Sequence, residues 1–86
     1  SGGALQELAP DLKKELAELE RKYRAKLAEA ELSGAARLQE TGSADPEAAT
    51  RIRDEISAAL AAIRKDWERA QAKVRQRQHQ KPQDQT

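Results

Sequence analysis

The segment from Ile52 to Val74 limits the fold of this chain more than any other. Its larger apolar side chains recur at intervals of three, four or seven residues, at Ile52, Ile56, Leu60, Ile63, Trp67 and Val74. Residues at these intervals fall on one side of an α-helix. The pattern therefore predicts a long helix with one apolar stripe, which needs a second surface to pack against.

A matching stripe lies in the first half of the chain. Pro10 suits the first position of a helix, where its missing N–H costs nothing, and the acidic Asp11 follows in the first turn. The stripe then continues through Leu12, Leu16, Leu19, Tyr23, Leu27, Ala30, Gly34 and Leu38. We expect a first helix over about 10–40.

The connection between the two stripes is short. Gly42 suits the left-handed position that ends many helices, and Asp45 and Pro46 are typical of the N-cap and first position of the next helix. A second helix is expected over about 46–78. A brief connection between matched helices favours an all-α, two-helix antiparallel coiled-coil hairpin, which could pair with a second copy as a four-helix bundle. An open, parallel coiled coil is the alternative.

A register follows if the turn centres on Ser43, because facing residues then have numbers that add up to about 86. Gly34 would face Ile52, Leu27 would face Ala59, and Trp67 would face Leu19. A glycine inside a helix costs about 1 kcal/mol relative to alanine. Close approach of the second helix would explain Gly34, and a kink or an early helix end would be the other explanation.

Several apolar residues are expected beside the contact between the two helices rather than within it. We expect them to form a surface of low relief for a partner, made by Leu32, Leu60, Ala28, Ala35 and Ala61. The partner would be another protein helix or a second copy of this chain. Tyr23 and Trp67 are expected to pack within the hairpin, with contact to a partner as the alternative.

Outside the hairpin, residues 1–9 are interpreted as a tag remnant with a flexible lead-in, and residues 79–86 as a disordered polar tail. Arg69, Lys73, Arg75 and Arg77 offer a possible anion contact near the end of the second helix. The balance of 16 basic and 15 acidic residues gives no general attraction to nucleic acid. A solvated helix end is therefore favoured over an accessory nucleic-acid site.

Catalytic chemistry is not expected. The chain has no cysteine, and its one histidine, His79, lies in the polar tail. Ser43 and Ser57 lack a histidine base nearby in sequence, and no spacing typical of a metal site occurs. We expect no cofactor, no metal and no membrane span, since no apolar run approaches the roughly 20 residues that a span needs. The lack of a signal peptide and of cysteines favours an intracellular location.

The segment Gly34-Ala35-Ala36-Arg37-Leu38, followed by a helix that opens at Asp45 and Pro46, resembles the HR1 family. HR1 domains are antiparallel coiled-coil fingers in Rho-effector kinases and in membrane-curving adaptor proteins. The local motif is the pentapeptide Gly-Ala-x-x-Leu. The resemblance implies a helical hairpin that binds an activated Rho-type GTPase, and it assigns no contact residue.

Overall fold

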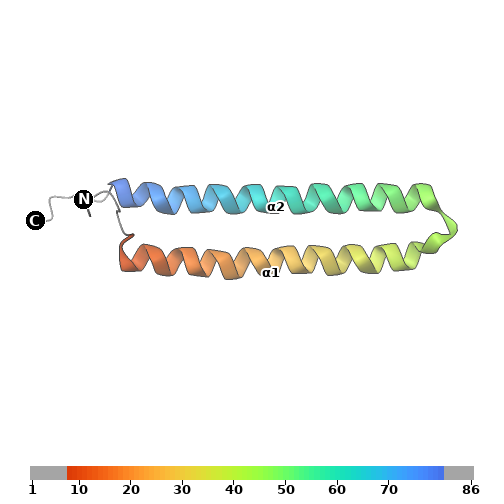
Figure 1. Ribbon diagram of the computed structural model, residues 1–86, viewed down its shortest axis with the longest axis horizontal. Helices are drawn as coiled ribbons and strands as arrows, with labels where there is room; N and C mark the ends of the chain where they lie inside the picture. Colours follow the sequence, from red (N-terminus) through yellow and green to blue (C-terminus); the bar gives the residue numbers. More distant parts are fainter. Residues whose placement is uncertain (1–7, 81–86) are drawn as a thin grey trace, which may run out of the picture.

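The computed structural model describes residues 8–80, apart from the side chains of Ser43, His79 and Gln80. This part consists mainly of two helices, α1 (Pro10–Thr41) and α2 (Pro46–Gln80), joined by the 3₁₀ turn η2 (Gly42–Ala44). The helices lie side by side and antiparallel (Figure 1). The start of α1 and the end of α2 form the open end, and η2 forms the turn end. The predicted all-α hairpin is confirmed.

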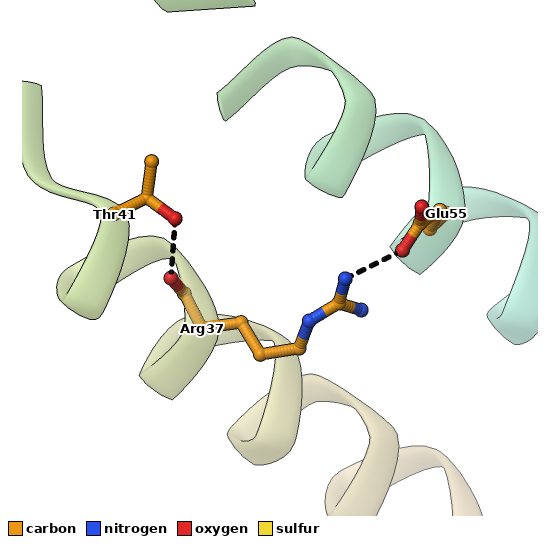
Figure 2. Close-up of polar contacts among 3 residues, drawn as sticks. All are labelled: Arg37, Thr41 and Glu55. Carbon is orange, nitrogen blue, oxygen red and sulfur yellow. Dashed lines mark hydrogen bonds and ion pairs between the residues drawn. The ribbon is translucent and has the colours of Figure 1, made fainter. Parts of the chain in front are cut away.

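The first helix ends at a glycine, as the sequence indicates. Gly42 has a φ of 69°, in the left-handed region that side chains disfavour, and its N–H donates to the carbonyl of Leu38. Thr41 adds a hydrogen bond of 3.0 Å from its hydroxyl to the carbonyl of Arg37 (Figure 2). Two carbonyls of the last turn are thereby satisfied, and the chain leaves the helix axis toward α2.

The second helix begins at the predicted cap. A side-chain oxygen of Asp45 accepts a hydrogen bond of 3.1 Å from the N–H of Ala48, and Pro46 occupies the first helical position. The far end of α2 extends to Gln80, two residues beyond the expected end, so its backbone is helical where the tail was expected to start. Residues 81–86 of that tail lie outside the described residues.

The open end also holds part of the expected lead-in. The N–H of Ala9 donates a hydrogen bond of 3.1 Å to the side-chain oxygen of Gln78 on α2. Leu8 and Ala9 are half-buried. Residues 8 and 9 therefore belong to the packed hairpin, and residues 1–7 lie outside the described residues.

The line along which α1 and α2 meet, here called the seam, holds the core. Its buried apolar residues are Leu12, Val74, Ala49 and Ile52, with exposed fractions of 1%, 4%, 8% and 9%. Gly34 is buried as well. Other apolar seam residues are half-buried: Leu16, Leu19, Tyr23, Leu27, Ala30, Leu38, Ile56, Leu60, Ile63, Trp67 and Ala70. The most buried side chains thus lie toward the two ends of the hairpin.

The register differs from the expected one. A Cβ on Gly34 would meet Ile56, with Cγ1 of Ile56 at 2.5 Å, and the ring of Tyr23 stacks on that of Trp67. In both pairs the residue numbers add up to 90 rather than 86. A shift of four residues is about one helical turn, so the same stripes still face each other. The expected pairs of Gly34 with Ile52 and of Trp67 with Leu19 were wrong.

This shift explains the position of Leu60. In the observed register Leu60 lies at the level of Ala30, and it is half-buried at the seam. Ala59, which was expected to face Leu27, is exposed. We expected Leu60 on a separate surface beside the seam, and that expectation was wrong, because Leu60 lies at the seam itself.

Candidate functional site

The aromatic residues form a stack in the middle of the seam. The ring centroids of Tyr23 and Trp67 lie 6.1 Å apart with the ring planes 4° from parallel. The ammonium groups of Lys22 and Lys26 each lie 5.5 Å from the Tyr23 centroid, and the Arg24 guanidinium lies 6.0 Å from that of Trp67. These distances suit cation–π attraction. The structure thus places both rings inside the hairpin, with cations against them.

One polar atom of this stack has no partner. The indole Nε1 of Trp67 is buried and has no hydrogen-bond partner within the described chain. A buried N–H without an acceptor costs free energy, so the ring is held there by its apolar contacts. The stack reads as a packing element of the hairpin.

Two ion pairs connect α1 to α2 across the seam. Figure 2 shows Arg37 of α1 extending its guanidinium to Glu55 of α2. The nitrogen and oxygen of this pair are 2.6 Å apart. Near the open end Arg77 of α2 pairs with Glu15 of α1. The hydrogen bond to Glu15, with the charges of Glu15 and Asp11, raises the pKa of Arg77. Both pairs place opposite charges at fixed levels, and they favour the observed register.

The four expected anion contacts are not one free patch. All four cations are exposed, but Arg77 is paired with Glu15 and Arg69 lies 3.5 Å from Asp66. Arg75 is two residues from both Lys73 and Arg77, and it therefore projects about 200° around α2 from each of them. The geometry favours a solvated helix end with internal charge pairing.

The five expected partner-binding residues lie on three surfaces. Leu32 follows the seam residue Ala30 by two positions and therefore points to the side of α1 away from α2. We call the side of each helix opposite the seam its outer face. Leu32 is 72% exposed there, and Ala28 and Ala35 of the same face are also exposed. Ala61 lies on the outer face of α2, on the opposite edge of the hairpin, while Leu60 lies at the seam.

An open hollow lies on the outer face of α2. It is a shallow depression of about 650 Å³, open to solvent and lined by Ala58, Ala61, Ala62, Arg64, Lys65 and Glu68. Its lining combines three alanines with three longer charged side chains. Leu32 is the large apolar residue that is most exposed among the described ones, and the hollow is an exposed alanine-lined surface on the other helix.

Sequence reasoning missed the ion pairs across the seam. Glu15, Arg37 and Glu55 each stand next to a seam residue in the sequence. Arg77 follows the seam residue Val74 by three positions, so all four flank the seam, where charges of facing helices meet. Pairing opposite charges beside the two stripes, as in Arg37–Glu55 and Glu15–Arg77, would have favoured a register in which the numbers of facing residues add up to about 92. The observed sum is 90. The charge pattern was therefore the signal that could have corrected it.

The described residues hold no group of three or more His, Cys, Asp or Glu side chains that could bind a metal ion. Within the same part of the chain, neither helix is long and apolar enough to cross a membrane. Comparisons with models of protein families, with curated proteins and with solved structures found no match to this chain.

Proposed function

We propose that this chain is a non-catalytic helical hairpin that binds a protein helix, or a second copy of itself, through its outer faces. The observation that carries this proposal is Leu32, a large apolar residue that is 72% exposed. Ala28 and Ala35 lie about one turn on either side of it and are exposed too. Small neighbours let a second helix approach to the usual axial distance of about 8–10 Å.

The energetics support docking at this position. Complete burial of a leucine side chain is worth about 1.5–3 kcal/mol. The seam itself has four buried apolar residues among the described ones, so the hairpin has a thin core. A partner that binds only the folded hairpin would also stabilise it by mass action. Binding and folding are therefore expected to reinforce each other.

Site-specific photo-crosslinking tests the proposal. A benzoylphenylalanine at position 32, introduced in the cells that make the protein, should yield discrete protein adducts that mass spectrometry can identify. The matched control is the same residue at position 33, because Ser33 is also exposed but points about 100° away around α1. If position 32 gives no adduct beyond that control, docking through the outer face of α1 is ruled out.

Two alternative functions stay predictions. In the HR1-like segment, Gly34 and Leu38 have packing roles at the seam, which accounts for them without a GTPase. Equal binding of the GTP-loaded and GDP-loaded forms of Rho-type GTPases would exclude that function. Nucleic-acid binding through Arg69–Arg77 would weaken steeply with added salt, whereas helix docking on an apolar face would not.

A further inference from the structure

We propose that the partner is a second copy of this chain, whose α2 hollow receives Leu32. The inference rests on the proposed function and names its partner. Leu32 is the protruding element, 72% exposed on the outer face of α1. The hollow of about 650 Å³ at Ala58, Ala61 and Ala62 is the receiving element, on the outer face of α2. One molecule thus carries both complementary features.

The two features lie at the same level along the hairpin. In the register set by Gly34 with Ile56 and Tyr23 with Trp67, Leu32 is level with Ala58. A second copy placed beside the first in the same orientation brings its α2 against α1 of the first. The two helices are then antiparallel, as they are within one hairpin, and Leu32 enters the hollow without any shift along the axis.

The charges beside the two features complement each other in this arrangement. Toward the open end, the outer face of α1 carries Glu18 and Arg21, and that of α2 carries Glu68 and Arg69. At the same register Glu68 lies one residue from the level of Arg21, and Arg69 lies three residues, less than one turn, from the level of Glu18. Arg69 is itself level with Arg21, but it already lies 3.5 Å from Asp66 within α2. Arg21, Glu18 and Glu68 form no ion pair within the described chain. A second copy supplies an opposite charge for each of them.

This complementarity favours a second copy over an unrelated helix. An unrelated partner would have to match the leucine on one edge or the hollow on the other, and the edges would then serve separate purposes. The same chain matches both edges at once, with the same register and with opposite charges at adjacent levels.

The contact has a consequence for assembly. The interacting surfaces differ, with the Leu32 edge of one copy against the hollow edge of the next, so the interface is heterologous. Each copy keeps one unused edge after a single contact. Such interfaces continue into a row of side-by-side hairpins unless they close into a ring. A dimer is therefore a step in assembly and not its end point.

Sedimentation equilibrium of purified chains tests the contact. The wild type should form species heavier than a dimer as concentration rises. Leu32→Glu removes the protruding side chain and Ala61→Glu fills the hollow, so each variant alone should sediment as a monomer. An equimolar mixture of the two should give a dimer, because one intact leucine edge then meets one intact hollow. Both positions are exposed, and circular dichroism should show unchanged helix content.

The alternatives give different results. A wild type that stays monomeric would overturn the inference, and so would a mixture that stays monomeric. An Ala61→Glu variant that still dimerises would indicate a symmetric contact between α1 edges instead. Ser33→Glu is the matched control, since it adds the same charge beside Leu32 but on another side of α1, and it should assemble like the wild type.

The crosslinking experiment separates this inference from the function on which it rests. With the photoreactive residue at position 32, the purified chain should form an adduct at residues 58–68 of a second copy. A monomeric chain whose position 32 reacts with a different protein in cells would overturn the second-copy contact and keep the docking function. If position 32 formed no adduct at all, both the second-copy contact and the proposed docking function would be excluded.

Discussion

The two ends of the hairpin and its middle are held together differently. Each end combines a buried apolar pair with an ion pair across the seam: Leu12, Val74, Glu15 and Arg77 at the open end, and Ala49, Ile52, Arg37 and Glu55 at the turn end. In the middle, from Leu19 to Ala30 and from Leu60 to Ala70, every apolar seam residue is half-buried. The ion pairs described there connect residues of one helix only.

The difference separates two tasks of the same seam. An ion pair between two helices forms only when its two side chains lie at nearly the same height along the helix axes. The ion pairs at the ends can therefore fix the register and orientation of the helices. The middle relies on non-directional apolar contacts, above all the Tyr23–Trp67 stack, and it leaves more surface open. The exposed Leu32 and the α2 hollow lie near this middle part, where we propose that another copy docks.

The largest expected loss of stability comes from truncating a leucine at the open end, and a leucine in the middle of the hairpin serves as the comparison. Leu12→Ala should destabilise the hairpin by about 3 kcal/mol, because Leu12 is 1% exposed and its removal leaves a cavity. Leu27→Ala in the middle should cost about half as much, since that side chain is already half-exposed to water. Urea unfolding followed by circular dichroism measures both.

This comparison is best made in the Leu32→Glu background, so that assembly does not add to the measured stability. Equal losses for Leu12→Ala and Leu27→Ala would mean that the middle is as tightly packed in solution as the ends. The contrast between ends and middle would then be lost.

Trp67 tests how the middle is held. Trp67→Ala should cost about 2–3 kcal/mol, below the full range for a buried aromatic residue because the ring is half-exposed. Trp67→Phe should cost less than about 1 kcal/mol, since the stack on Tyr23 is kept and the indole N–H has no acceptor to lose. Denaturant unfolding by circular dichroism suits both variants. A loss in Trp67→Phe as large as in Trp67→Ala would show that Nε1 has a partner in solution.

Gly34 tests the close approach beside the middle. Alanine is favoured over glycine in a helix by about 1 kcal/mol, but its Cβ would overlap Ile56. Overpacking of this kind costs about 1–3 kcal/mol, so Gly34→Ala should destabilise the hairpin by about 1 kcal/mol overall. In an Ile56→Ala background the obstructing atoms are absent, and the same change should become stabilising. An unchanged sign would indicate that the helices do not approach closely at this level.

The sequence predicted the helices and their connection because those depend on local interactions. The spacing of leucines and isoleucines, the Asp45–Pro46 start and the left-handed Gly42 each act within a few residues. It did not predict the register, because a shift of one turn leaves apolar residues facing apolar residues. The difference between Ile52 and Ile56 opposite Gly34 depends on how two helices approach in space.

The candidate site was predictable in part for the same reason. Leu32 and the alanines were identified as surface residues from their positions on each helix, and the structure places Leu32, Ala28, Ala35 and Ala61 on outer faces. The misplacement of Leu60 followed from the register. That α1 and α2 turn their outer faces toward opposite edges becomes visible only once both helices are packed.

The smallest expected effect concerns the ion pair at the turn end. A double-mutant cycle with Arg37→Gln and Glu55→Gln should give a coupling of about 0.2–1 kcal/mol at low salt, because both side chains are about half-exposed. The coupling should fall in 1 M NaCl, where screening acts over about 3 Å. The matched control is the Arg24–Glu20 pair within α1, which supports the helix but cannot align it with α2.

The Arg37–Glu55 pair is informative about the ends of the hairpin because of its effect on how α1 and α2 align, and not because its coupling energy is large. If the ends fix the register, losing Arg37–Glu55 should weaken the preference for Gly34 opposite Ile56, while losing Arg24–Glu20 should not. Disulfide trapping between cysteines placed at 34 and 56, and separately at 34 and 52, reads that preference directly. Suppose that the 34–56 disulfide is equally preferred after loss of Arg37–Glu55 and after loss of Arg24–Glu20. The register would then be set by seam packing alone, because the close approach at Gly34 and the aromatic stack would resist a one-turn slip without help from charge.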